Sequence, residues 1–306
     1  MAPIGVGVVL YSVGPVFVQA SDASGPVFSF WRLWFGVLVL GIAALAHGAV
    51  THQWPRLRAL GWAVGAGVAF GIHQLLLFTA IKATTVADVT LLSALGPLVT
   101  ALLALPFFGE RPGTAFRVWS AVAMCGAAVV AVGGGSGPEG DPWGMALALG
   151  NVVFFAVFFL MSKGSRGRLA LLPFLFGVMT VAAITVSGYV LVADESVGAV
   201  TSTDLSYAAI VAVAPGFLGH VVMTWPLGWV PANVPPVMRL GVPVLASIWA
   251  WWFLGETIAL THVGGGLLTL LGVGGAVLSP AGRRFVNGER SRHPAPPGST
   301  PADPAR

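Results

Sequence analysis

Five polar side chains, from two arginines, two histidines and one glutamine, lie inside long apolar stretches of this sequence. Arg32 occurs in PVFSFWRLWFGVLVL, and His73 and Gln74 occur in VAFGIHQLLLF. Further along the chain, His220 lies in PGFLGHVVMTW and Arg239 in VPPVMRLGVPV. A guanidinium group recognises carboxylate or phosphate oxygens, and an imidazole exchanges protons near neutral pH. These five residues are therefore the candidates for binding a small molecule.

The apolar stretches that surround them are typical of a membrane protein. Hydrophobic residues make up 56% of the 306 residues and charged residues only 8%, whereas a soluble domain carries about 25% charged residues. A helix needs roughly 20 apolar residues to cross the bilayer. Ten stretches qualify, at about 4–21, 26–46, 59–80, 86–107, 114–133, 143–162, 170–192, 206–226, 234–254 and 260–279. We therefore predict an all-α membrane protein with ten transmembrane helices in the lipid bilayer.

The basic residues predict the orientation of these spans. If the N-terminus is cytoplasmic, twelve of the 15 lysines and arginines lie in inside loops or in the C-terminal tail, and only Lys82 lies outside. The other two are Arg32 and Arg239, within spans. An excess of basic residues marks the cytoplasmic side, so we expect a multi-pass protein of the cell (plasma) membrane with both termini in the cytoplasm. Because the basic residues form no patch, the high pI does not indicate a nucleic-acid partner.

The charged residues within the spans indicate a polar path. An arginine at the centre of a membrane helix costs about 2.5–3.5 kcal/mol, so such residues usually face a cavity. In the predicted orientation Arg32 and His73 lie toward the outer surface, and His220 and Arg239 toward the inner one. No Asp or Glu lies at comparable depth. We interpret the five residues as a substrate path that favours an anionic or zwitterionic small molecule.

Two other interpretations of these residues stay open. An arginine at this depth can snorkel to the lipid headgroups, and a histidine can serve as a hydrogen-bonded packing residue. A histidine on the path could also couple transport to protons.

A proline-to-glutamate cassette occurs twice, as LGPLVTALLALPFFGE and LGVPVLASIWAWWFLGE. Three pairs of residues correspond at an offset of 146 positions, namely Pro97 and Pro243, Gly109 and Gly255, and Glu110 and Glu256. Each copy contains five spans, and because five is odd, the second copy must be inverted relative to the first. We assign the cassette a structural role, since a glutamate beside the N-terminus of the next span is favoured by the helix dipole. The alternative role is a coupling carboxylate.

The two cassettes, the ten spans and the arginine of the second span resemble the drug/metabolite transporter superfamily, EamA type. The resemblance covers about residues 4–280 and implies two five-helix repeats. The expected boundaries are 1–133 for the first repeat, 134–142 for an extracytoplasmic linker, 143–280 for the second repeat and 281–306 for a disordered, basic cytoplasmic tail. Members of this family export amino acids, other metabolites or drugs, and inverted repeats suit alternating access. We therefore expect a secondary transporter of the efflux type.

Other classes of protein find little support in the sequence. It has one cysteine, Cys125, and it has no nucleotide-binding loop, HExxH or GxSxG motif. We predict no catalytic residue, metal or cofactor, and no enzymatic activity. The alternatives are a non-transporting membrane scaffold or sensor and an intramembrane lipid-modifying enzyme. A homodimer through the glycine-rich spans five and ten is a further hypothesis.

Overall fold

The part of the chain that the structure describes is mostly helical. The computed structural model describes residues 2–52, 60–83, 89, 92–93, 95–109, 112–133, 142–166, 168–232, 234–242, 244–245, 248–249, 252 and 260–278. The long helices are α1 (Ala2–Ala20), α2 (Gly25–Thr51), α3 (Leu60–Ala83), α5 (Gly96–Phe108), α6 (Thr114–Gly133), α7 (Pro142–Gly164), α8 (Leu171–Val192) and α13 (Leu260–Leu278). The shorter elements are α9 (Ser202–Val211), the π-helix η2 (Ala212–Gly219), α10 (His220–Thr224), the 3-10 turn η3 (Trp225–Gly228) and α11 (Val234–Arg239).

Five helical stretches in the described residues are long and apolar enough to cross a membrane. They are Gly25–Thr51, Gly61–Ala83, Pro142–Gly164, Leu171–Val192 and the continuous stretch Ser202–Gly228. Shorter apolar helices cover Ile4–Ala20, Gly96–Phe108 and Val263–Ala276. The prediction of an all-α protein with several membrane spans is therefore confirmed.

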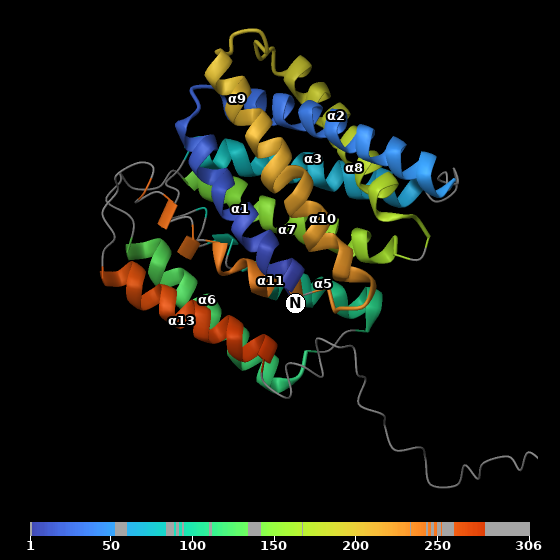
Figure 1. Ribbon diagram of the computed structural model, residues 1–306. Coiled ribbons are helices and arrows are strands. Elements are labelled where there is room, and N and C mark those ends of the chain that lie inside the picture. Colours follow the sequence, from blue (N-terminus) through green and yellow to red (C-terminus); the bar gives the residue numbers. More distant parts are fainter. Residues whose placement is uncertain are drawn as a thin grey trace, which may run out of the picture.

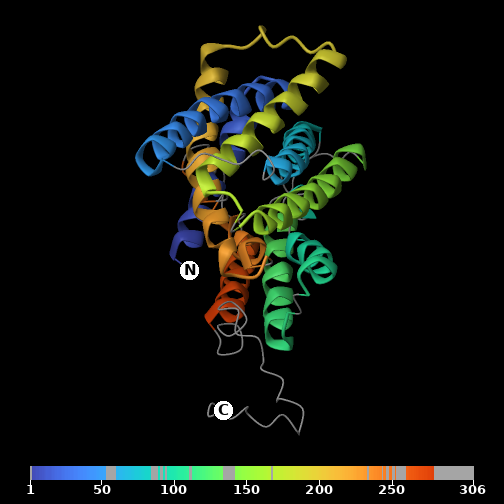
Figure 2. The same cartoon turned by 90° about the vertical axis from the view of Figure 1, so that its right-hand side faces the viewer.

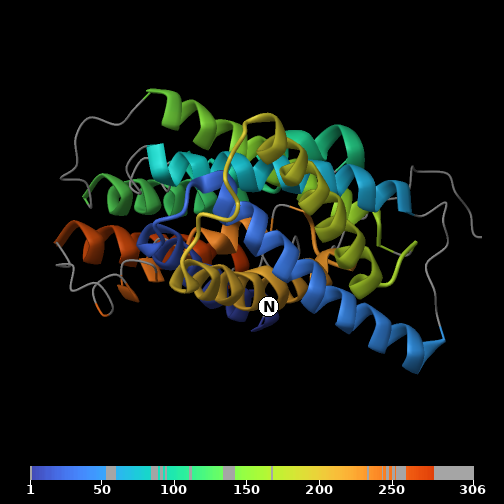
Figure 3. The same cartoon turned by 90° about the horizontal axis from the view of Figure 1, so that it is seen from above.

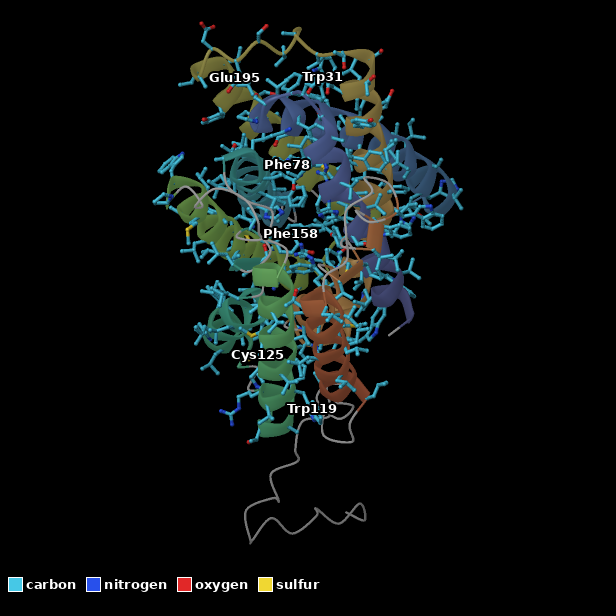
Figure 4. The ribbon with its side chains drawn as sticks, turned by 90° about the vertical axis from the view of Figure 1, so that its left-hand side faces the viewer. Trp31, Phe78, Trp119, Cys125, Phe158 and Glu195 are labelled. Atoms are coloured by element: carbon cyan, nitrogen blue, oxygen red, sulfur yellow. The ribbon has the colours of Figure 1, made fainter. Side chains whose placement is uncertain are left out.

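The helices form a layered bundle. Helices α2, α8 and α9 lie on one side and the pair α6 and α13 on the opposite edge, with α1, α3, α5, α7, α10 and α11 between them (Figures 1 and 2). Seen from above, α3, α6 and α13 lie roughly along one axis, whereas α2 and α8 cross it obliquely (Figure 3). The largest apolar cluster packs α2, α3, α7 and α8 around Phe70, Phe158 and Phe174. The labelled Phe78 and Phe158 lie in the central layer, whereas Trp119 and Cys125 lie on α6 at the edge (Figure 4).

Helix α3 packs between α7 and α8. Trp62 lies against Gly164 and Leu76 against Gly150, so α3 and α7 run antiparallel. On the α8 side, Ala63 lies against Gly177 and Gly71 lies against Ala182, so α3 and α8 run parallel. These directions are those of helices that cross the membrane alternately.

Helices α6 and α13 form a close antiparallel pair. A Cβ atom added to Gly126 would lie 2.6 Å from Oγ1 of Thr269, and one added to Gly272 would lie 2.6 Å from Cα of Ala123. Only glycine permits such an approach of two helix backbones. Glycines of the fifth and tenth spans, which suggested a homodimer, therefore pack within one chain; the homodimer itself stays a prediction.

One predicted span boundary was wrong, and one predicted span contains a segment that is not α-helical. The second span was expected to end near residue 46, but α2 continues to Thr51 and ends where His52 adopts a left-handed φ of 53°. The stretch HGAVT has no proline, and a single glycine does not end a helix. The eighth span, expected at about 206–226, lies within the continuous apolar stretch Ser202–Gly228, in which the α-helix changes to a π-helix around Pro215.

The turn between α1 and α2 is fixed by a buried carboxylate at the start of α9. Oδ1 of Asp204 accepts hydrogen bonds from Oγ of Ser21 at 2.7 Å and from the backbone N–H of Asp22 at 2.9 Å. Its Oδ2 closes a capping box with Thr201. Nζ of Lys82, at the end of α3, donates to the carbonyl oxygen of Ser21 at 2.5 Å. Asp204 therefore ties the start of α9 to the turn between α1 and α2, and Lys82 joins α3 to the same turn.

Candidate functional site

All five of the predicted path residues line one cavity. Its volume is about 150 Å³, and α1, α2, α3, α5, α7, α9, η2, α10 and α11 contribute to its wall. Arg32, His73, Gln74, His220 and Arg239 are among the lining residues. The sequence assigned them to an outer and an inner set, whereas the structure brings both sets to the same space. Depth counted along straight α-helices misses this in part because the helix changes to the π-helix η2 just before His220.

Arg32 lies in the interior of the protein, with 2% of its surface exposed. Its Cζ lies 5.4 Å from the centre of the Phe70 ring, and its Nη1 donates to the sulfur of Met179 at 3.6 Å. A thioether is a weak acceptor, and Nε of Arg32 has no hydrogen-bond partner. A snorkelling arginine would keep its head group at the surface, so the snorkelling interpretation does not fit this geometry.

Arg239 ends helix α11 and is held between two aromatic rings. Its Cζ lies 4.0 Å from the centre of the Phe155 ring and 5.0 Å from the centre of the Tyr11 ring. Such cation–π contacts attract a guanidinium but leave its N–H groups free to donate. Nε of Arg239 has no partner, and the described residues that line the cavity include no Asp or Glu.

The two histidines present the same ring nitrogen to a backbone carbonyl. Nδ1 of His220 lies 2.8 Å from the carbonyl oxygen of Pro215, and Nδ1 of His73 lies 3.4 Å from that of Asn151. A carbonyl oxygen only accepts, so Nδ1 carries the hydrogen in both rings and Nε2 of the neutral ring is an acceptor. Nε2 of His220 has no partner. The ring of His73 stacks on Phe155 with centres 4.3 Å apart.

Polar atoms without partners gather at this cavity. The described residues contain eleven buried side-chain nitrogen or oxygen atoms without a hydrogen-bond partner. Six of the eleven belong to residues that line the cavity, namely Tyr11 Oη, Arg32 Nε, Gln74 Nε2, Asn151 Oδ1, His220 Nε2 and Arg239 Nε. Buried polar groups in folded proteins almost always have partners. A concentration of unpartnered groups therefore marks a place where a bound molecule or water completes the hydrogen bonds.

Sequence reasoning missed three residues of this site. Asn151 could have been found, because it interrupts the otherwise apolar stretch WGMALALGNVVFFAVFFL, and a polar residue within a span is a functional candidate. Tyr11 lies in the short first span, and its contact with Arg239 depends on the packing of α1 against α11. Phe155 is one of several phenylalanines in the same stretch, so only the structure distinguishes it.

The cassette lies mostly outside the described residues, which exclude Glu110, Pro243, Gly255 and Glu256. The structure describes Pro97, which is buried in the first turn of α5, and Gly109, which caps the same helix with a φ of 62°. The N–H of Gly109 donates to the carbonyl oxygen of Leu105 at 3.0 Å. This left-handed cap is a glycine role, and neither residue lines the cavity.

Comparison with protein families decides the class of this molecule. The model of the EamA-like transporter family matches twice, over residues 4–132 and 142–278. The chain belongs to the EamA-like transporter family. The expected membership of the drug/metabolite transporter superfamily is thereby confirmed, and this EamA chain is a multi-pass membrane protein with two EamA repeats.

Comparison with solved structures supports the same fold. One solved chain, described as "Crystal structure of protein", superposes with a TM-score of 0.74 at 18% sequence identity, over 92% of this chain and 96% of the other. At this identity the likeness shows the fold alone. No curated protein matches the chain. Among the described residues, no group of three or more His, Cys, Asp or Glu could hold a metal ion.

Proposed function

We propose that this EamA chain is a secondary transporter that exports a small carboxylate-bearing metabolite by alternating access. The observation that carries the proposal is the set of six unpartnered polar atoms around one cavity in a transporter-family protein. Guanidinium groups form strong, charge-assisted hydrogen bonds with carboxylates. An amino acid or another organic acid would supply the missing partners.

The polar atoms divide into donors and acceptors. Nε of Arg32, Nε of Arg239 and Nε2 of Gln74 donate, so they suit carboxylate oxygens. Oδ1 of Asn151 and Nε2 of His220 accept, so they suit a hydroxyl or ammonium group of the substrate. In a proton-coupled cycle the same nitrogen of His220 would accept the proton.

We further propose ten spans in two inverted repeats, 1–133 and 143–280, with 134–142 as the extracytoplasmic linker. The packing partners support this arrangement. Helix α3 lies antiparallel to α7; α1 likewise lies antiparallel to η2 and α10, with Gly14 against Pro215 and Gly7 against Met223. In the proposed repeats, span three corresponds to span eight and span one to span six. The contact of α3 with α7 is then equivalent to the contact of α1 with η2 and α10. Helices α6 and α13, the corresponding fifth and tenth spans, are antiparallel, as a two-fold axis in the membrane plane requires.

Both repeats contribute walls to the cavity. Helices α1, α2, α3 and α5 come from the first repeat, and α7, η2, α10 and α11 from the second. A relative movement of the two repeats would therefore change which side of the membrane the cavity faces. We place both termini, including the tail 281–306, in the cytoplasm and the protein in the plasma membrane, in line with the distribution of basic residues.

The test compares metabolites in the medium of cells that overproduce three proteins at equal membrane levels: the native protein, Arg239→Ala and Arg117→Ala. Arg117 is the matched control, because it is exposed on α6 and its side chain donates to Oγ1 of Thr114. We expect one carboxylate-bearing compound to accumulate with the native protein and with Arg117→Ala, but not with Arg239→Ala. Equal accumulation with all three would remove Arg239 from the path. A medium identical to that of cells without the protein, together with no uptake into liposomes, would contradict transport and favour the scaffold or sensor.

A further inference from the structure

The cavity contains two separate cationic poles. Arg32 contacts Phe70 and Met179, whereas Arg239 contacts Tyr11 and Phe155, so the two guanidinium groups share no partner among these contacts. The ring of His220 packs against one aromatic ring from each set. Its centre is 4.8 Å from that of Phe70 and 5.2 Å from that of Tyr11. The two guanidinium groups are therefore held by different sets of side chains.

Each pole carries a charge that no described neighbour neutralises. The described lining residues include Arg32 and Arg239 but no Asp or Glu. An isolated charge in a low-dielectric interior is costly, and a bound counter-charge removes much of that cost. A substrate with one negative charge would leave one pole uncompensated, whereas a substrate with two would neutralise both.

The volume of the cavity limits the size of the substrate. A protein cavity of about 150 Å³ holds one benzene molecule, and the cavity here has about the same volume. Apolar and aromatic side chains such as Leu77, Val152 and Phe155 form part of its wall. These groups suit a short hydrocarbon chain that joins two charged ends.

We propose that the substrate is a small dicarboxylate that places one carboxylate at Arg32 and the other at Arg239. This inference rests on the proposed transport function and specifies its substrate class. Nε2 of His220 and Oδ1 of Asn151 are acceptors without partners at the same cavity, so a hydroxyl or amino substituent on the chain would supply their hydrogen bonds.

The test measures exchange in liposomes that contain the purified full-length protein. Labelled malonate, succinate, glutarate and adipate are each offered outside vesicles loaded with the same unlabelled acid. Succinamate, in which an amide replaces one carboxylate of succinate, and butyrate are the matched single-charge probes. Labelled alanine and glycerol phosphate are offered in the same way as substrates of other classes. We expect exchange of at least one dicarboxylate. We also expect the single-charge analogue to compete at least about tenfold more weakly, because charged hydrogen bonds are the strong ones.

Two variants test the assignment of each pole. Arg32→Gln and Arg239→Gln should each lower dicarboxylate exchange at least about tenfold, since each removes one charged partner. Each should also shift the preference toward succinamate, because an amide pairs with the new glutamine. The exposed control Arg117→Gln should keep the native preference, and thermal unfolding of each variant shows that it is folded.

The possible outcomes separate the two proposals. Exchange of butyrate, alanine or glycerol phosphate, without exchange of any dicarboxylate, overturns the two-pole assignment and leaves a transporter of small anions or amino acids. Exchange of none of these compounds by folded, reconstituted protein overturns both proposals. Dicarboxylate exchange that survives in Arg32→Gln and Arg239→Gln overturns the assignment of the poles.

Discussion

The cavity and the α6–α13 pair differ in how their helices pack against one another. In the α6–α13 pair, Gly126 and Gly272 let two backbones meet directly, and Gly275 makes room for the ring of Trp119. At the cavity, helices meet around arginines, histidines and amides whose polar atoms lack partners. The first region stabilises the fold without a ligand. We expect the second to be less stable in the empty protein and to gain stability when a substrate binds.

The largest expected effect is at Arg239. We expect Arg239→Met to lower transport about a hundredfold, because loss of one partner of a buried charge pair costs about 2–5 kcal/mol of binding. The same change should raise the melting temperature of the empty protein, because a methionine packs against Phe155 without an unpaired charge. Transport assays in liposomes and thermal unfolding measure the two effects. A lower melting temperature would mean that Arg239 stabilises the fold, and the contrast between the two regions would fail.

The second effect is at the glycines of α13. Gly272→Ala should lower the free energy of unfolding by about 1–3 kcal/mol, because the new Cβ would overlap the backbone of Ala123 and overpacking has this cost. Gly274→Ala is the matched control, since a Cβ there meets open space. It should stabilise helix α13 slightly, by up to about 1 kcal/mol. Thermal unfolding of both variants in the same detergent measures the difference, and equal destabilisation would count against the predicted packing.

The third effect tests a buried polar group that has its partners. Asp204→Ala should lower the free energy of unfolding by about 1–2 kcal/mol, because it removes the capping box and the bonds from Ser21 and Asp22. Ser206→Ala, an exposed change on the same helix, is the control. Asp204 and Arg239 are both polar, so opposite shifts in melting temperature would sharpen the distinction between partnered and unpartnered groups. Shifts in the same direction would remove it.

The smallest effect is at Tyr11. Its hydroxyl has no partner, and its ring lies 5.0 Å from Cζ of Arg239. Tyr11→Phe keeps the ring, so the melting temperature should stay the same. If the hydroxyl binds the substrate, the KM of transport should rise about two- to tenfold, which corresponds to one hydrogen bond of roughly 0.5–1.5 kcal/mol. An unchanged KM would place the hydroxyl away from the substrate.

Much of the fold could be predicted where the sequence has clear interruptions. The stretches 114–133, 143–162 and 170–192 correspond to α6, α7 and α8 within about two residues, because turn-forming residues flank them. The eighth span was found as well, but the sequence did not predict the π-helical segment around Pro215, where the hydrogen-bonding pattern changes without ending the helix. Mean apolarity is the same in an α-helix and a π-helix, so composition cannot distinguish them.

The site was predictable in its residue types but not in its geometry. The cost of a charge within the membrane singled out Arg32 and Arg239 from their neighbours. The cost of a polar group within the membrane, applied to Asn151, would have added this residue to the five that were predicted. The partners that matter for the chemistry, such as Tyr11 and Phe155 around Arg239, come from helices distant in sequence. No periodicity within one span indicates which ring of another span will lie beside a guanidinium.

The π-helical turn η2 determines the direction in which the following residues point around the helix axis. Each residue of an α-helix advances roughly 100° around that axis, and a π-helical hydrogen bond spans one residue more than an α-helical one. The inserted residue therefore rotates everything after it by about one such step. His220 is the first residue after this turn. Its imidazole thus owes its direction toward the cavity to an angular offset made in the backbone, and a helical projection drawn from the sequence would assign it to the wrong face.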